Sequence, residues 1–309
     1  MIGTITLNPS IDQHWRAAGF KQDDANRAVS VRLTPGGKGI NVSKVIRELG
    51  GETRAFTLLG GLPGRFLREL AGPLDFPLSA ISICENTRMN TILTDIKKGT
   101  QTRISAPGPR LSASDLGKFV KVLLCAKPKP SFWIFGGSPP RGLKTSVYRD
   151  LIYVLQKNGT PCVLDADDDA LRLGVQAKPF MIKPNEFEMQ RLCGKTLHTV
   201  RDYRRAAQHF VKRGIQLVVV SLAARGAIFV TGEDAFRIGT PSVAVQSHLG
   251  AGDALIGGVI WGLSQKMPLR SAAQYGIAAS TSAVMREAPR LCRRGDISGL
   301  LKRLTVQEL

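Results

Sequence analysis

Short apolar runs alternate along the chain with segments of helical hydrophobic period. The chain opens with an alternating run that ends at Asn8-Pro9, and later runs rich in β-branched and aromatic residues span Phe132–Phe135, Cys162–Leu164, Phe180–Ile182, Leu217–Val220 and Ala227–Val230. Between them, apolar residues recur at helical spacing in Ser112–Leu124, Val147–Leu155 and Val200–Val211. Strands that alternate with helices of this length predict crossover units. We therefore expect a three-layer α/β/α fold with a mostly parallel central sheet.

Two regions, about residues 10–34 and 87–105, interrupt this alternation. The first is polar and largely unpatterned, and the second contains two strand-like runs, Asn90–Ile96 and Thr102–Ser105, joined by a turn with a glycine. Neither region suits a crossover unit, so we expect the two insertions to form a small β-sheet lid. The sequence contains no internal repeat and no linker. We therefore expect residues 1–309 to form one domain that carries this lid.

The composition indicates a basic protein with a large core. The chain has 309 residues, of which 43% are hydrophobic, and its formal net charge at pH 7 is +19. Such a charge is compatible with nucleic acid, an anionic membrane surface or anionic small molecules as partners. Charged residues make up only 22% of the chain and the basic ones are scattered, so the charge alone does not identify the partner.

The cysteines and the apolar runs indicate a cytoplasmic protein. The five cysteines are far apart and include no CxxC pair, which argues against a disulfide framework or a zinc site and suits a reducing compartment. No stretch approaches the roughly 18 apolar residues that a transmembrane helix needs, and the alternating start does not have the form of a signal peptide. We therefore expect no membrane partner.

The segment Pro35–Val42 is the first with candidate chemistry. Gly36, Gly37 and Gly39 precede a helical stripe that ends at Gly50. Glycines before a helix allow backbone N–H groups to approach a ligand, and the helix dipole favours an anion there. Lys38 adds a positive charge and Asn41 an amide. A glycine-rich turn without a ligand remains an equal alternative.

The segment Gly250–Asp253 carries a more specific signal. Asp253 follows a Gly-Ala-Gly turn at the start of a helix, where free N–H groups can hold an anion. A carboxylate beside such a turn can accept a proton from a hydroxyl group while the amides stabilise a transferring phosphoryl group. We favour this interpretation over a simple helix cap. The glycines that follow in the helix, at 257, 258 and 262, indicate that backbone or ligand packs closely there.

The segment Lys183–Glu188 follows the expected strand Phe180–Ile182. Asn185 and Glu188 are three residues apart, a spacing that suits a shared hydrated Mg²⁺ ion. The same spacing also suits a capping box, in which Asn185 begins a helix and Glu188 completes the cap. Taken alone, this segment favours the capping box.

Six segments together resemble one family, the ribokinase-like (PfkB) carbohydrate kinases, and within it the phosphosugar branch that includes 1-phosphofructokinase, tagatose-6-phosphate kinase and the minor 6-phosphofructokinase. They occur in the family's order through almost the whole chain and are Thr6–Asp12, Gly36–Val42, Thr87–Asn90, Gly137–Gly142, Lys183–Glu188 and Gly250–Asp253. The resemblance implies the ribokinase-like fold with its small lid.

The resemblance also implies roles for individual residues. Asp253 would be the general base, and the amides of Gly250, Ala251 and Gly252 would form the anion hole. The residues implied for the sugar phosphate are Asp12, Arg27, Gly37, Lys38, Asn41, Arg88, Asn90 and Ser138, with Arg27, Lys38 and Arg88 on its phosphate group. The residues implied for ATP are Lys183, Asn185, Ser221, Ala223, Gly226 and His248. A Mg²⁺ ion would be held by Asn185 and Glu188 through water.

The implied reaction transfers the γ-phosphoryl group of ATP to a hydroxyl group of a ketohexose phosphate. Fructose 1-phosphate is the preferred acceptor, with fructose 6-phosphate and tagatose 6-phosphate as further candidates. The resemblance further implies Mg²⁺, a monovalent cation in some members, and a homodimer formed through the lid. A ribokinase- or nucleoside-type kinase with an uncharged acceptor is one alternative. A non-catalytic, nucleic-acid-binding protein on the same scaffold is a weaker one.

Three positions depart from the family pattern. Ala223 stands where a glycine is usual before the nucleotide, and its methyl group would crowd ATP or shift the loop. His248 stands where a small hydroxyl residue is usual, and we expect a tolerated loop residue near the nucleotide, with a changed nucleotide contact as the alternative. The acidic turn Asp165–Asp169 replaces a Ser/Gly-containing turn, and we expect it to be a solvated loop, with a cation contact near the site as the alternative.

Overall fold

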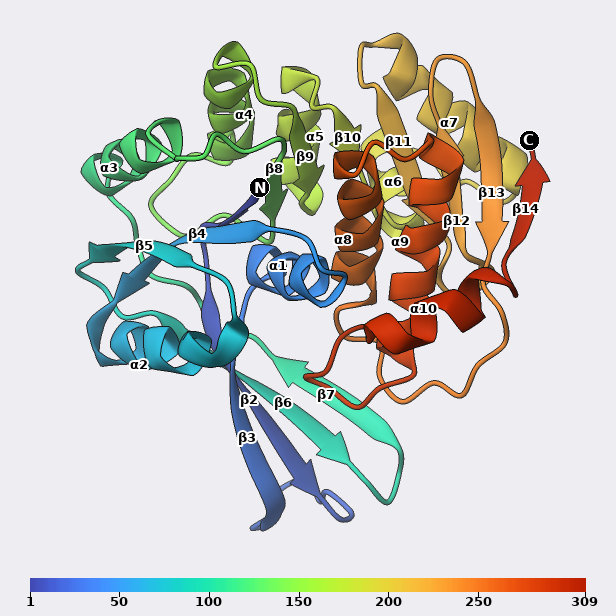
Figure 1. Ribbon diagram of the computed structural model, residues 1–309. Coiled ribbons are helices and arrows are strands. Elements are labelled where there is room, and N and C mark those ends of the chain that lie inside the picture. The colour runs from blue at the N-terminus through green and yellow to red at the C-terminus, as the bar shows by residue number, and fades with distance from the viewer.

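The computed structural model describes residues 1–309 and contains two β-sheets (Figure 1). The larger sheet has the strand order β14-β13-β12-β11-β10-β9-β8-β1-β4-β5. Its strands are β1 (Ile2–Thr6), β4 (Thr53–Gly60), β5 (Leu78–Ile83), β8 (Trp133–Gly136), β9 (Cys162–Asp165), β10 (Met181–Ile182), β11 (Leu217–Ser221), β12 (Ala227–Val230), β13 (Ala235–Gly239) and β14 (Thr305–Glu308). The strands from β5 to β11 are parallel, and β12 to β14 continue the sheet antiparallel.

Helices cover both faces of this sheet. They are α1 (Lys38–Glu48), α2 (Gly61–Ala71), α3 (Ala113–Leu124), α4 (Val147–Lys157), α5 (Asp168–Gly174), α6 (Glu186–Cys193), α7 (Val200–Lys212), α8 (Ala251–Ser264), α9 (Leu269–Val284) and α10 (Arg294–Leu301). Strand β8 separates two cores, because side chains alternate across a strand. Trp133 and Phe135 pack with helices α3 to α7, and Ile134 packs with α1, α8 and α9. The expected three-layer α/β fold is confirmed.

The smaller sheet is formed by the two interrupting regions. Its strands are β2 (Ser10–Ala17), β3 (Ala28–Gly36), β6 (Arg88–Asp95) and β7 (Thr100–Ile104), in the order β3-β2-β6-β7. It projects from the main body below α1 and α2 (Figure 1). The cross-strand register puts Asp12, His14, Thr34, Ile92 and Arg103 on one face and Trp15, Val31, Leu33, Leu93 and Ile104 on the other.

Close backbone packing explains the glycines of α8. A Cβ atom on Gly258 would lie 2.7 Å from Gly276 Cα, and one on Gly262 would lie 2.8 Å from Ala272 Cα, both in α9. A Cβ atom on Gly257 would lie 2.7 Å from a methyl group of Val45 in α1. The glycines therefore allow three helices to pack closely, and their partner is protein and not a ligand. No helix is both long and apolar enough to cross a membrane.

Candidate active site

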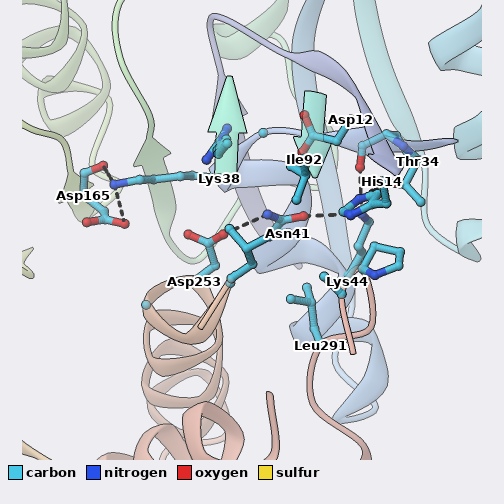
Figure 2. A pocket seen from close by; sticks show the side chains of 18 of the residues that line it. Asp12, His14, Thr34, Lys38, Asn41, Lys44, Ile92, Asp165, Asp253 and Leu291 are labelled. Atoms are coloured by element: carbon cyan, nitrogen blue, oxygen red, sulfur yellow. Dashed lines mark hydrogen bonds and ion pairs between the residues drawn. The ribbon is translucent and has the colours of Figure 1, made fainter. Parts of the chain in front are cut away.

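The sequence motifs converge at the carboxyl ends of the parallel strands. They lie under the polar face of the smaller sheet, which is called the lid from here on. A cavity of about 360 Å³ lies there, lined by residues from both sheets and from the starts of α1, α6 and α8 (Figure 2). Open α/β sheets bind ligands at this edge, because the loops after the strands and the helix N-termini meet there. Its lining is mostly polar, with Asp12, Lys38, Asn41, Lys183 and Asp253 among the charged and amide groups.

A second cavity, of about 690 Å³, adjoins the first. The two share Asn185, Ser221 and Gly252 in their linings. The second is more apolar, and its walls include Phe187, Val243 and further aliphatic side chains. A polar cavity that opens into a larger apolar one suits a hydrophilic acceptor beside a ligand with a flat apolar group.

The N-terminus of α8 lies at the junction of the two cavities. Gly250 precedes the helix with φ +77°, a left-handed conformation that favours glycine, and a Cβ atom there would also collide with Leu291. The first intrahelical bond runs from the N–H of Ala254 to Gly250 O, and no side chain caps the helix. The N–H groups of Ala251, Gly252 and Asp253 therefore have no partner within the helix and can bind an anion.

Asp253 is buried beside these amides, with 7% of its surface exposed. Its Oδ2 atom accepts a hydrogen bond of 2.9 Å from Asn41 Nδ2, across 212 residues of sequence. Burial, together with the nearby charge of Asp165, raises the pKa of Asp253 to about 6. A carboxylate with this pKa is ionised at neutral pH and is a stronger base than an exposed aspartate.

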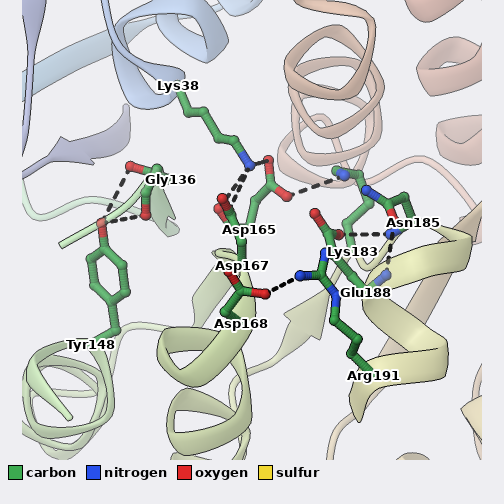
Figure 3. Close-up of polar contacts among 11 residues, drawn as sticks. Lys38, Gly136, Tyr148, Asp165, Asp167, Asp168, Lys183, Asn185, Glu188 and Arg191 are labelled. Carbon is green, nitrogen blue, oxygen red and sulfur yellow. Dashed lines mark hydrogen bonds and ion pairs between the residues drawn. The ribbon is translucent and has the colours of Figure 1, made fainter. Parts of the chain in front are cut away.

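Asp165 holds two lysines at the floor of the cavity (Figure 3). It is 2% exposed, and its oxygens lie 3.2 Å from Lys38 Nζ and 3.1 Å from Lys183 Nζ. Burial acts to raise the pKa of Asp165, but the two lysines outweigh it and lower this pKa. Asp167 also lies 3.5 Å from Lys38. The expectation that the acidic turn is a solvated loop is therefore wrong for Asp165, because its charge is matched by lysines from distant segments.

Asn185 and Glu188 form the capping box of α6. Asn185 Oδ1 accepts from the N–H of Glu188 at 2.9 Å, and Glu188 Oε2 accepts from the N–H of Asn185 at 2.8 Å. Both residues also line the first cavity. No group of three or more His, Cys, Asp or Glu side chains is arranged to hold a metal ion. One carboxylate and one amide fit a Mg²⁺ ion that keeps most of its ligands as water and phosphate oxygens.

The residues expected at the sugar phosphate divide into two sets. Five of them lie at the first cavity: Asp12, Gly37, Lys38 and Asn41 line it, and Asn90 donates a hydrogen bond of 2.8 Å to Asp12 Oδ1. The other three, Arg27, Arg88 and Ser138, are not part of its lining. Arg27 and Ser138 are exposed. Arg88 donates to the backbone oxygens of Asn8 and Ala106, and its buried Nε atom has no hydrogen-bond partner.

Four polar side chains of the first cavity were not among the residues expected from the sequence. They are His14, Thr34 and Arg103 on the polar face of the lid and Lys44 in α1. Alternation along the lid strands places the first three beside Asp12, but only once the strand register is known. Lys44 follows Asn41 by three residues, so a helical spacing alone could have placed both on one face.

The residues expected at ATP are distributed over both cavities. Lys183, Asn185 and Ser221 line the first, and Ala223, Gly226 and His248 line the second. Ala223 adopts φ +50°, a left-handed conformation that costs a residue with a Cβ atom about 1 kcal/mol. The loop thus keeps a conformation suited to glycine. Phe187, exposed at 73%, also lines the second cavity.

Comparisons with known proteins match the chain over almost its whole length. The family model described as pfkB family carbohydrate kinase matches residues 2–294. A 1-phosphofructokinase from Borreliella burgdorferi is 29% identical over 310 residues, covering 100% of this chain and 99% of the relative. The ATP-dependent 6-phosphofructokinase isozyme 2 of Escherichia coli is 31% identical and covers 96% of each chain.

Solved structures extend the comparison to the fold. The crystal structure of Escherichia coli phosphofructokinase-2 in complex with substrates and products superposes with a TM-score of 0.93 at 30% identity, covering 97% of this chain and 98% of that one. A structure of the same enzyme in complex with potassium gives the same score, identity and coverage. Its tetrameric inhibited form gives a TM-score of 0.91 at the same identity and coverage.

Proposed function

This chain belongs to the pfkB family of carbohydrate kinases, and on that premise we propose that it transfers the γ-phosphoryl group of ATP to a hydroxyl group of a ketohexose phosphate, with fructose 1-phosphate as the preferred acceptor. One observation carries the proposal: a polar cavity and an apolar cavity meet at Gly252, next to the buried carboxylate of Asp253. An acceptor in the first cavity and a nucleotide in the second would bring their reacting atoms together at this junction.

The reaction follows from the groups at the junction. Asp253 accepts the proton of the acceptor hydroxyl group as the hydroxyl oxygen attacks the γ-phosphorus atom; the bond between this phosphorus and the bridging oxygen breaks, and ADP leaves. The N–H groups of Ala251 and Gly252 stabilise the charge that develops on the transferring group. The ammonium group of Lys183 lies close to these amides, since its Nζ atom would be 3.4 Å from a Cβ atom placed on Gly252. Its positive charge therefore helps to stabilise the transferring group. The polar face of the lid covers the acceptor and excludes water, which would otherwise compete as the nucleophile.

A divalent and a monovalent cation belong to the same proposal. Glu188 and Asn185 would hold Mg²⁺ through water, and the ion would neutralise charge on the nucleotide phosphates. The monovalent cation rests on the potassium complex of the Escherichia coli relative alone. A cytoplasmic location is proposed because all five cysteines are free, which suits a reducing compartment.

The direct test is an ADP-release assay with purified protein, ATP and Mg²⁺. The acceptor panel contains fructose 1-phosphate, fructose 6-phosphate and tagatose 6-phosphate, with fructose, ribose and adenosine as uncharged comparisons. We expect turnover with at least one ketohexose phosphate at a kcat/KM at least tenfold above every uncharged acceptor. Faster turnover of an uncharged sugar or nucleoside would overturn the phosphosugar assignment, and no turnover with any acceptor would favour the non-catalytic alternative.

Replacing Arg88 by Ala should separate the charged from the uncharged acceptor. The buried, unpartnered Nε atom of Arg88 supports a role as an anion ligand, since a buried donor without a protein partner is costly. We expect the KM for the phosphosugar to rise about tenfold, an energy of about 1.4 kcal/mol, while the KM for ATP changes less than twofold. Steady-state kinetics with each substrate varied in turn measure both values. Equal changes in the two would argue against a phosphate contact.

We further propose that the chain forms a homodimer through the lid. The lid face that points away from the cavity carries Val31 and Ile104, which are 47% and 64% exposed, and Met89 lies on the same face. An exposed apolar sheet face next to an active site is typical of an interface. A second copy of the chain would bury this face and leave the polar face free.

Replacing Val31 by Lys should dissociate this dimer. A charge at the centre of an apolar interface is buried without a partner, which strongly disfavours association. We expect the mass measured by size-exclusion chromatography with light scattering to fall from twice 33.4 kDa to about that of one chain. Leu62→Lys is the matched control, because Leu62 is 71% exposed but lies on α2 outside the lid. An unchanged mass for Val31→Lys would exclude the lid as the interface.

A further inference from the structure

Lys44 lies behind the proposed general base and takes no part in the reaction as described above. It is on α1, three residues after Asn41, and lines the first cavity. Its Nζ atom donates one hydrogen bond of 2.7 Å to Pro35 O and a second of 3.3 Å to Asn41 Oδ1. Asn41 Nδ2 in turn donates to Asp253 Oδ2 at 2.9 Å. Lys44, Asn41 and Asp253 therefore form one hydrogen-bonded chain, which Figure 2 shows.

The chemistry of the ammonium group decides which way the Asn41 amide points. An ammonium group has only donors, so it can pair with the oxygen of a side-chain amide and not with its NH₂ group. Once the oxygen faces Lys44, the NH₂ group faces Asp253. An NH₂ group can donate to a carboxylate, but it cannot accept from a protonated carboxyl group, so this orientation favours the ionised form of Asp253.

Resting on the function proposed above, we propose that Lys44 is a positioning residue for the reaction: its ammonium group fixes the Asn41 amide so that this amide holds Asp253 as the ionised base. The bond to Pro35 gives the same residue a structural link to the lid, because Pro35 is near the end of β3, where the chain leaves the lid for α1. Asp253 is thus oriented by side chains of α1, the helix that follows lid strand β3.

Burial brings the pKa of Lys44 close to neutral pH, although the nearest carboxylates oppose this shift. On the cavity side the charged and titratable groups are Asp12, His14, Arg32, Arg103 and Asp253. On the other side of Lys44, where a surface pocket begins, they are Arg47, Glu48, Asp75 and Arg294. Burial, opposed by Asp12 and Asp253, lowers the pKa of Lys44 to about 8. Above this pH the neutral amine can also accept a hydrogen bond, and the Asn41 amide is no longer held in one orientation.

The first experiment measures the effect of Lys44 on the pKa of Asp253 and does not rely on kinase activity. The carboxyl carbon of Asp253 is titrated by ¹³C NMR in the wild-type protein and in Lys44→Met. We expect the pKa of Asp253, about 6 in the wild type, to rise by at least half a unit in Lys44→Met, because the amide can then turn its oxygen toward the carboxyl group. Arg47→Met, on the same helix but in an exposed ion pair with Asp75, should leave this pKa unchanged. An unchanged value in Lys44→Met would overturn the proposal.

The second experiment uses the conservative variant and separates positioning from substrate binding. Lys44→Arg keeps a donor-only cation that does not titrate, so it should retain kcat within about threefold and keep its activity between pH 8 and 9, where the wild type loses about threefold. Lys44→Met should lower kcat about tenfold and change each KM less than twofold. A rise in the phosphosugar KM without a fall in kcat would make Lys44 a substrate ligand and overturn the positioning role.

The two experiments keep this proposal separate from the function on which it rests. If the wild-type protein showed no turnover, the proposed function would fail, and the NMR titration would still decide whether Lys44 controls Asp253. If Lys44→Met did not fold, which a loss of its cooperative thermal transition would reveal, the pH profile of Lys44→Arg would decide. In that case, an alkaline loss of activity identical to that of the wild type would overturn the proposal.

Discussion

Replacing Asp253 by Asn should lower kcat about 10³-fold while ATP binds with nearly unchanged affinity. General-base catalysis contributes about 10²- to 10⁴-fold, and an amide cannot accept the proton of the attacking hydroxyl group. The N–H groups at the start of α8 and the second cavity remain intact, so the contacts available to the nucleotide are preserved. ADP-release kinetics measure kcat, and isothermal titration calorimetry measures the affinity for ATP.

The same variant should be more stable than the wild type. Burial raises the pKa of Asp253 from 3.8 to about 6, so the ionised carboxylate destabilises the folded state above pH 6. Below pH 4 the group is protonated in both states and has no effect, so this cost grows as the pH rises from about 4 to 6. Removing the carboxylate charge should raise the free energy of unfolding at pH 7 by about 3 kcal/mol. Asp150→Asn, at an exposed position in α4, is the control for both measurements. Full turnover in Asp253→Asn would remove Asp253 from the role of base.

Replacing Asp165 by Asn should lower the free energy of unfolding by about 3 kcal/mol at neutral pH. The change leaves Lys183, whose side chain is 6% exposed, without its partner, and loss of one partner of a buried ion pair typically costs about 3–5 kcal/mol. The pKa of Asp165 is lowered in the folded state, so its ionised form stabilises the protein at neutral pH. This stabilisation is lost as the pH falls below the ordinary pKa of an aspartate and through the lowered one. Urea denaturation followed by circular dichroism measures the change.

Asp169→Asn provides the matched control for Asp165→Asn. Asp169 pairs with Arg172, and both side chains are more than half exposed, so the loss of this pair should not change stability measurably. The Asp165 variant should also lower the pKa of Asp253, since Asp165 is one of the causes of its elevation. Equal stabilities of the two variants would mean that Asp165 does not hold the two lysines.

The sequence predicted those parts of the fold that carry strong local signals. The predicted strands from Phe132 to Val230 and the three predicted helices agree with β8 to β12, α3, α4 and α7 within two residues. Helix α9 was missed because it packs on α8 through small residues such as Gly276, and small residues give no apolar stripe. Strands β13 and β14 were missed as well, and β14 is exposed along its whole length.

Site residues were predicted where a single sequence motif contains the reactive or binding groups. Contacts between residues of distant segments were missed. Asn41 and Asp253 stand in separate glycine-rich segments, and the structure joins them directly. The burial of Asp165 has no local signal, because it depends on Lys38 and Lys183 from other elements. Whether the residues proposed for the sugar phosphate and for ATP bind these ligands stays a prediction.

The pH dependence of kcat/KM for the phosphosugar is the most direct test of the claim that Asp253 is the base. With a pKa of about 6, the carboxylate is protonated below that pH, so kcat/KM should be constant from about pH 6.5 to 7.5 and fall tenfold per unit below pH 6. A profile that stays flat down to pH 4.5 would contradict the account, because the proton of the acceptor would then go to a group other than this buried carboxylate.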